Sequence, residues 1–190
     1  MTANLPNLLT WTRILLIPFF VALFYLPDGW LGPHAKNVAA AGIFLVAAVT
    51  DWLDGWLARS FNQTSAFGAF LDPVADKLMV AAALIVLVRL GRVDEIVSVI
   101  IIGREIAISA LREWMAKIGE SRSVAVSFVG KVKTACQMIA ILMLLYHEPV
   151  LGMFDLQWLG TVLIYVAAVL TLWSMIYYLR MAMARIRARS

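Results

Sequence analysis

The chain has 190 residues, of which 63% are hydrophobic and 15% are charged, and its mean hydropathy is +0.87. Soluble domains use about 45–50% apolar residues. The composition therefore excludes an ordinary soluble domain and indicates an integral membrane protein. The net charge of +4 and the pI near 9.5 suit a protein that lies among anionic lipids.

Apolar segments long enough to cross about 30 Å of hydrocarbon follow one another along the chain. The first contains Arg13 and is followed by no small-residue cleavage site, so we interpret it as a retained helix rather than a signal peptide. Together the segments nearly fill the chain, which predicts one all-α, polytopic membrane domain over residues 1–190. The six predicted transmembrane helices cover residues 8–26, 38–58, 69–89, 96–116, 124–146 and 156–179.

The positions of lysine and arginine predict the orientation of these helices, because cytoplasmic loops are enriched in both residues. The C-terminal tail and the connection between the fourth and fifth segments are basic, whereas residues 147–155 contain neither lysine nor arginine. We therefore expect both termini on the cytoplasmic side of the membrane. The segments near 27–37, 90–95 and 147–155 are then expected to face outward.

Four aspartates interrupt the second and third apolar segments close to their cytoplasmic ends. A charged side chain at the centre of a bilayer costs about 2.5–3.5 kcal/mol, so four that faced lipid would cost on the order of 10 kcal/mol. That cost is comparable with the whole stability of many proteins. We therefore expect these carboxylates to line a polar cavity and to be neutralised by cations: they are Asp51, Asp54, Asp72 and Asp76.

The spacing of the aspartates predicts that they converge. Residues three or four apart share one face of a helix, which applies to Asp51 with Asp54 and to Asp72 with Asp76. Pro73 favours the start of a helix, so we expect Asp72 and Asp76 on the first turns of the third helix. Carboxylate oxygens suit hard divalent cations, and two such ions can clamp a phosphate during in-line displacement.

The run from Asp51 to Asp76 resembles the signature of the CDP-alcohol phosphotransferase family at every defined position. The resemblance implies a six-helix membrane enzyme that transfers a phosphatidyl group from CDP-diacylglycerol, or a related CDP-linked donor, to an alcohol and releases CMP. It also implies a homodimer. The matching residues are Asp51, Asp54, Gly55, Ala58, Arg59, Gly68, Asp72 and Asp76.

The resemblance also implies a role for each matching residue. The four aspartates would hold two Mg²⁺ or Mn²⁺ ions, and Asp76 would in addition act as the general base. The CDP-binding set combines signature residues with two positions of the N-terminal segment. Its members are Asn7, Thr10, Gly55, Ala58, Arg59 and Gly68.

Downstream polar residues predict a site for an anionic acceptor. The chain as a whole resembles the branch of the family that uses sn-glycerol 3-phosphate as acceptor and forms phosphatidylglycerophosphate. Arginine supplies a fork of donors and lysine a point charge to a phosphate. The expected acceptor-phosphate residues are Arg104, Arg112, Lys131 and Lys133.

Several alternatives compete with these interpretations. Asn7 and Thr10 could cap the first helix, and Arg104 with Glu105 could form a buried ion pair between helices. Inositol phosphate, serine or choline could replace glycerol 3-phosphate as the acceptor. The acidic cluster is also compatible with a membrane prenyltransferase or, outside enzymes, a divalent-cation transporter. No nucleic-acid partner is expected.

Overall fold

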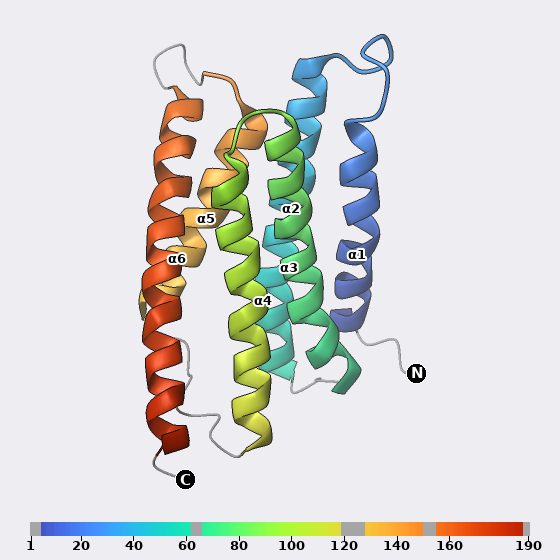
Figure 1. Ribbon diagram of the computed structural model, residues 1–190. Helices are drawn as coiled ribbons and strands as arrows, with labels where there is room; N and C mark the ends of the chain where they lie inside the picture. The colour runs from blue at the N-terminus through green and yellow to red at the C-terminus, as the bar shows by residue number, and fades with distance from the viewer. Residues whose placement is uncertain (1–4, 62–65, 119–127, 150–154, 188–190) are drawn as a thin grey trace.

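A computed structural model shows an all-α bundle (Figure 1). It describes residues 5–61, 66–118, 128–149 and 155–187, and within these ranges the side chains of 5–9, 52, 54–61, 66–70, 72, 128–129, 131 and 185–187 lie outside the description. The described residues form six helices, which confirms an all-α chain. They are α1 (Leu5–Leu23), α2 (Pro33–Phe61), α3 (Ala66–Arg89), α4 (Glu95–Lys117), α5 (Phe128–Tyr146) and α6 (Leu156–Arg187).

The helix boundaries differ from the predicted spans in an informative way. α2 begins at Pro33 rather than near residue 38, and α6 continues to Arg187 rather than ending near residue 179. Apolar length marks the part of a helix that suits hydrocarbon, whereas backbone hydrogen bonding continues through polar turns. Among the described residues, only Leu156–Ala184 is both long and apolar enough to cross a membrane; Thr10–Leu23 and Val132–Tyr146 are apolar but shorter.

The expected position of Pro73 is wrong. α3 begins at Ala66, so Pro73 lies inside the helix rather than on its first turn. Proline removes one backbone donor and therefore one helical hydrogen bond. Neighbouring helices and local adjustments of the backbone make such prolines tolerable in bundles of apolar helices. Asp76 consequently lies further along α3 than the sequence predicted.

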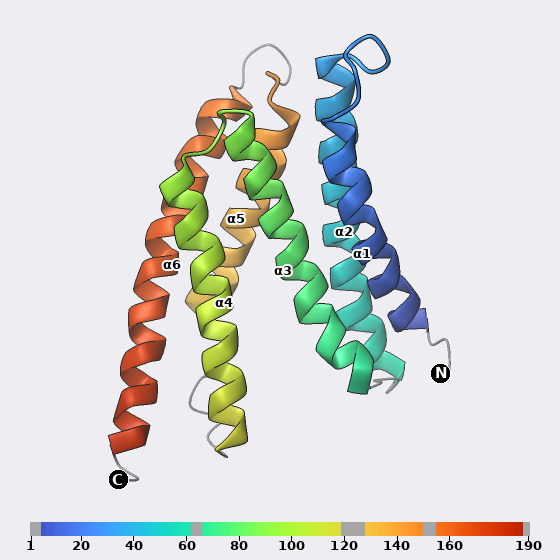
Figure 2. The ribbon, with the colours of Figure 1, turned by 45° about the vertical axis from the view of Figure 1, so that its right-hand side comes forward.

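The helices run alternately up and down, so α1 begins and α6 ends at the same end of the bundle (Figures 1 and 2). We call this the terminal end, and we call the end that holds residues 24–32 and 90–94 the loop end. α3 packs against α1, α2, α4 and α5, while α6 packs against α4 and α5. In Figure 2, α3 lies between the α1–α2 pair and the group of α4, α5 and α6.

The apolar core lies in the half of the bundle near the loop end. Phe20 of α1, Phe44 of α2 and Leu84 of α3 are buried there together with the first half of α4 and the second half of α5. The terminal half contains a smaller apolar cluster between α4 and α6. Its other buried side chains are largely polar or charged: Thr10, Arg13, Arg104, Lys133, Gln137, Thr171 and Ser174.

A Schellman turn ends α3 at the loop end. Gly91 adopts a φ of 67°, which glycine accepts without the steric cost that a side chain would bring. The N–H of Gly91 donates to the carbonyl of Val88, and the N–H of Arg92 donates to the carbonyl of Leu87, both at 2.9 Å. These two bonds define the motif, and the turn carries Arg92 out of α3 toward α2 and α5.

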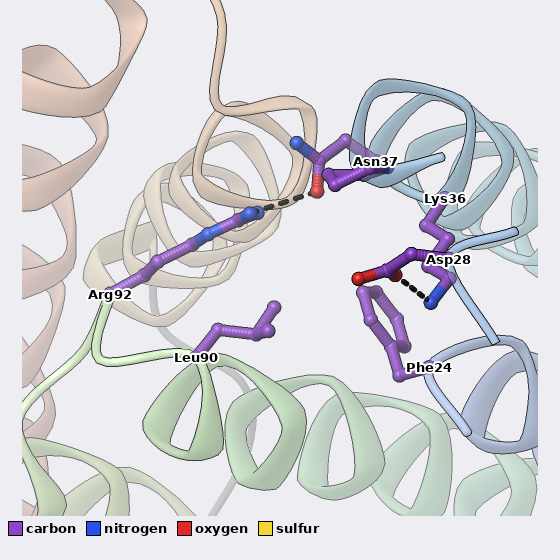
Figure 3. A pocket seen from close by; sticks show the side chains of 7 residues that line it. Phe24, Asp28, Lys36, Asn37, Leu90 and Arg92 are labelled. Atoms are coloured by element: carbon purple, nitrogen blue, oxygen red, sulfur yellow. Dashed lines mark hydrogen bonds and ion pairs between the residues drawn. The ribbon is translucent and has the colours of Figure 1, made fainter. Parts of the chain in front are cut away.

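Arg92 fastens three helices together at the loop end. Its guanidinium donates to the carbonyls of Leu144 and Leu145 at 3.0 and 3.1 Å. It also donates to Oδ1 of Asn37 at 2.8 Å, as Figure 3 shows. The two carbonyls belong to the last turn of α5, whose backbone acceptors have no partner within the helix. Arg92 therefore ties the ends of α3 and α5 to the beginning of α2.

A second cation closes the loop end beside Arg92. Lys36 is buried, and its Nζ donates to the carbonyl of Leu26 and, at 2.7 Å, to Oδ1 of Asp28. Figure 3 shows Lys36 and Arg92 on opposite sides of a cavity of about 240 Å³, with Phe24 nearby. Both cations are hydrogen-bonded to protein acceptors. These bonds hold the helix ends and the connecting segments together at the loop end.

We predict that Gly160→Ala destabilises the bundle. A Cβ atom at this position of α6 would lie 2.9 Å from Cγ of Leu144 and 3.2 Å from Cβ of Met143 on α5. Overpacking of this kind typically costs about 1–3 kcal/mol. The measurement is the midpoint of thermal unfolding of the purified protein in detergent. Gly42→Ala is the matched control, because no atom lies within 4 Å of the added methyl and alanine favours helices. Equal midpoints for the two variants would show that α5 and α6 do not pack this closely.

Candidate active site

An ion pair between α1 and α2 lies in the terminal half of the bundle. Nη1 of Arg13 donates to Oδ1 of Asp51 at 2.7 Å. The Arg13 side chain is only 1% exposed, whereas that of Asp51 is 45% exposed. A buried guanidinium requires a nearby negative charge, so Arg13 and Asp51 fix each other's positions. The Asp51 side chain thus remains partly accessible.

Asp76 of α3 shares this electrostatic environment. The charges of Asp51, Arg13, Glu105 and Lys77 all act on its half-buried carboxylate. Four helices, α1 to α4, therefore place charged groups around one region. Asp51 and Asp76 therefore lie near enough for their charges to interact, and their convergence on one metal site stays a prediction.

The other predicted metal ligands and most of the predicted CDP-binding residues cannot be compared with the structure in the same way. The side chains of Asp54 and Asp72 lie outside the described residues, and among the side chains that are described no three His, Cys, Asp or Glu residues form a metal-binding group. The four-aspartate centre therefore stays a prediction. The same holds for the CDP-binding roles of Asn7, Gly55, Ala58, Arg59 and Gly68, whose positions are also outside the described side chains.

Thr10 precedes Arg13 by three residues on α1, and its side chain is buried. α1 begins at Leu5, so both Asn7 and Thr10 lie within the helix. An N-cap residue flanks the helix and does not have helical backbone angles. The capping alternative for these two residues is therefore wrong, and a role for Thr10 toward a ligand stays a prediction.

A second cluster of charges joins α4, α5 and α6. Nζ of Lys133 and Nη1 of Arg104 both donate to the same oxygen, Oε1 of Glu105, the latter at 3.0 Å. Nη2 of Arg104 donates to Oγ of Ser174 at 3.1 Å. The side chains of Lys133 and Arg104 are 1% and 7% exposed. Arg104 and Glu105 are therefore paired, as the ion-pair alternative predicts, but both lie on α4. The pair between helices joins Glu105 to Lys133 of α5.

Two arginines of this region carry buried donor atoms that no described residue binds. Nε of Arg104 and Nε of Arg112 are buried and have no hydrogen-bond partner among the described residues. The guanidinium of Arg112 lies 5.3 Å from the ring centroid of Tyr178, a cation–π contact. An unpaired buried donor costs about 1–3 kcal/mol, so these atoms suit an anionic ligand. The side chain of Lys131, the remaining predicted acceptor residue, lies outside the described set.

Ser174 is a member of this cluster that the sequence did not reveal. It lies in α6, a long apolar segment that contains no charge before Arg180. Its hydroxyl accepts from Arg104 and donates to the carbonyl of Thr171 at 2.9 Å. Two buried hydroxyl residues three positions apart in an apolar helix are the signal that could have identified this face.

This chain is similar to known proteins along nearly its whole length. The family model for CDP-alcohol phosphatidyltransferase matches residues 3–173. The chain belongs to the CDP-alcohol phosphatidyltransferase family. The match includes the Asp51–Asp76 run together with Glu105 and Lys133, while Ser174 lies immediately beyond it. Membership in this family also sets aside the prenyltransferase and transporter interpretations.

Two curated members of the family are similar to this chain over nearly its whole length. Proteins from Escherichia coli (strain K12) and Shigella flexneri serotype 5b (strain 8401) are each 52% identical over 186 residues, which cover 97% of this chain and 97% of each relative. Both are named CDP-diacylglycerol–glycerol-3-phosphate 3-phosphatidyltransferase.

We predict that Arg13→Met destabilises this CDP-alcohol phosphatidyltransferase by about 1–3 kcal/mol, between the values for exposed and buried ion pairs. The substitution keeps an apolar stem but removes the cation from Asp51. The measurement is the thermal unfolding midpoint in detergent. Lys117→Met is the control, because it breaks an ion pair with Glu113 in which both side chains are 71% exposed, and its expected effect is within about 0.5 kcal/mol. A loss for Arg13→Met no larger than for the control would contradict a structural role for the Arg13–Asp51 pair.

Proposed function

We propose that this protein transfers the phosphatidyl group of CDP-diacylglycerol to sn-glycerol 3-phosphate, which yields phosphatidylglycerophosphate and CMP. The observation that carries the proposal is 52% identity, over 97% of both chains, to enzymes named for glycerol 3-phosphate. The buried cationic donors of Arg104 and Arg112 add support, because they suit an acceptor that carries a phosphate. Serine and choline offer no such group.

The metal site in this proposal consists of Asp51, Asp54, Asp72 and Asp76, which bind two Mg²⁺ or Mn²⁺ ions. Two observations fit such a site. Asp51 and Asp76 act on each other electrostatically, and Asp51 already attracts one cation, the guanidinium of Arg13. Carboxylate oxygens are the ligands that these ions prefer. When bound, the ions stabilise the negative charge that develops on the diphosphate during displacement.

Asp76 is the proposed general base. Its carboxylate takes the proton from the acceptor hydroxyl, whose oxygen forms a bond to the phosphorus of the phosphatidyl group as the bond from that phosphorus to the CMP oxygen breaks. The residues proposed to bind the CDP moiety belong to α1, α2 and α3. They are Asn7, Thr10, Gly55, Ala58, Arg59 and Gly68.

The proposed acceptor site consists of Arg104, Arg112, Lys131 and Lys133 on α4 and α5. Arg104 and Lys133 meet at Glu105, and the charge of Glu105 acts on Asp76. The acceptor phosphate and the base would therefore lie on neighbouring faces of the same polar region. This relation suits a small acceptor whose hydroxyl and phosphate are only a few bonds apart.

We also propose that the six helices cross the bacterial inner membrane, with both termini and the site on the cytoplasmic side, and that the enzyme is a homodimer. The outer surface supports membrane insertion, because every described helix exposes large apolar side chains and such extensive apolar exposure is rare in soluble monomers. Examples from α1 to α6 are Phe19, Val46, Ile85, Val99, Ile139 and Val169.

An acceptor screen tests the proposed function directly. Purified protein in detergent is given CDP-diacylglycerol and Mg²⁺ with glycerol 3-phosphate, inositol phosphate, serine or choline, and CMP release is measured. We expect rapid release with glycerol 3-phosphate, little with the other acceptors, and none after chelation of the metal. Preferential release with another acceptor would overturn the substrate assignment. Activity that survives chelation would overturn the metal site.

We predict that Asp76→Asn abolishes transfer while the protein still folds and binds CDP. Asparagine keeps the size of the side chain but cannot accept the proton, and loss of a general base typically lowers kcat by about 10²–10⁴-fold. The measurements are CMP release and calorimetric titration with CDP. Glu113→Gln on α4 is the control, because Glu113 and its partner Lys117 are both 71% exposed, and it should remain active. Normal transfer by Asp76→Asn would exclude Asp76 as the base.

A further inference from the structure

Glu105 accepts hydrogen bonds from two cations of the cluster that joins α4, α5 and α6. A single carboxylate oxygen, Oε1, accepts from both Lys133 of α5 and Arg104 of its own helix α4. The three side chains are largely withdrawn from solvent, with exposures of 1%, 7% and 23% for Lys133, Arg104 and Glu105. Buried cations of this kind repel each other, and an anion bound to both offsets that repulsion.

The guanidinium of Arg104 is held from two sides. Nη1 binds Glu105 at 3.0 Å, and Nη2 binds Oγ of Ser174 on α6 at 3.1 Å. A guanidinium is planar and carries its donors in a fixed fork. These two contacts therefore also fix the direction of Nε, the buried donor that has no partner among the described residues.

The charge of the cluster matches a phosphomonoester. Arg104, Arg112 and Lys133 contribute three positive charges and Glu105 contributes one negative charge, so their sum is +2. A phosphomonoester carries about −1.5 to −2 at pH 7. The carboxylate itself would repel such a ligand, so contact with the phosphate must come from the cations that Glu105 holds.

We propose that Glu105 is a positioning residue for the phosphorylated acceptor: its carboxylate holds Lys133 and Arg104 in the arrangement that binds the acceptor phosphate. This inference rests on the proposed function and adds to it a residue outside the predicted binding set. Glu105 does not touch the reacting atoms. It acts through the two cations, and its loss leaves Lys133 as a buried charge without a fixed counter-ion.

The test compares Glu105→Gln with the wild type by steady-state kinetics on the full-length protein. Glutamine keeps the reach and one acceptor oxygen but removes the negative charge. We expect the KM for glycerol 3-phosphate to rise about tenfold or more, as for the loss of a hydrogen bond to a charged group, while kcat and the KM for CDP-diacylglycerol change less than about threefold. A purely structural role would lower the amount of active protein without this selective rise in one KM.

Two further variants show whether Glu105 acts through its cations. Glu105→Asp keeps the charge on a shorter side chain, so we expect a smaller rise in the KM for glycerol 3-phosphate than with glutamine. Lys133→Gln should produce the same selective rise as Glu105→Gln. If Glu105 acts through Lys133, the double variant should be less impaired than the product of the two single effects. Fully multiplicative effects would overturn the coupling.

Glu113→Gln is the matched control, because Glu113 is also on α4 and pairs with a lysine but is 71% exposed. Its KM values should equal those of the wild type. If Glu105→Gln does not accumulate as folded protein, Glu105→Asp must still show the selective rise. A wild type that does not use glycerol 3-phosphate would overturn the proposed function. An active wild type with unchanged KM values in both Glu105 variants would overturn the role of Glu105 alone.

Discussion

The terminal half of the bundle depends on the pairing of buried charge. A lone charge in a medium of low dielectric constant is unstable, so each buried cation must be held against an anion. Arg13 satisfies this requirement with Asp51 on a neighbouring helix, and Lys133 satisfies it with Glu105. These pairs set which faces of α1, α2, α4 and α5 turn inward. The affinity for anionic substrates and metal ions that we propose would be a consequence of the same arrangement.

The loop half of the bundle holds the helices in position for this arrangement. Its core consists of interlocking apolar side chains, and Arg92 joins the ends of α3 and α5 to α2. Gly91 is needed because only a residue that accepts a positive φ can turn the chain toward those partners. Charged groups at the terminal end are thus carried on helices whose opposite ends are fixed by packing and hydrogen bonds.

The sequence predicted the features that depend on distance along one helix. Six helices follow from apolar length. The spacing of the aspartates predicts that they converge, and the charge of Asp51 does act on Asp76. Partners across helices were harder to predict, because a periodic pattern defines a face but does not say which neighbour that face meets. Glu105 and Lys133 are 28 positions apart, and their pairing depends on how α4 and α5 lie against each other. The contact of Ser174 with Arg104 is not predicted for the same reason, because it joins α6 to α4. The predicted position of Pro73 is wrong because the preference of proline for helix starts is only statistical.

The central position of α3 explains how one residue on it could serve both substrates of the proposed reaction. α3 packs against α1 and α2, which carry the residues proposed for the nucleotide and metal ions, and also against α4 and α5, which carry those proposed for the acceptor. Asp76 on this helix is influenced by Asp51 from one group and by Glu105 from the other. A base that removes a proton from one substrate so that it can attack the other must touch both sites. A helix that packs against both groups is the element on which such a base has to lie.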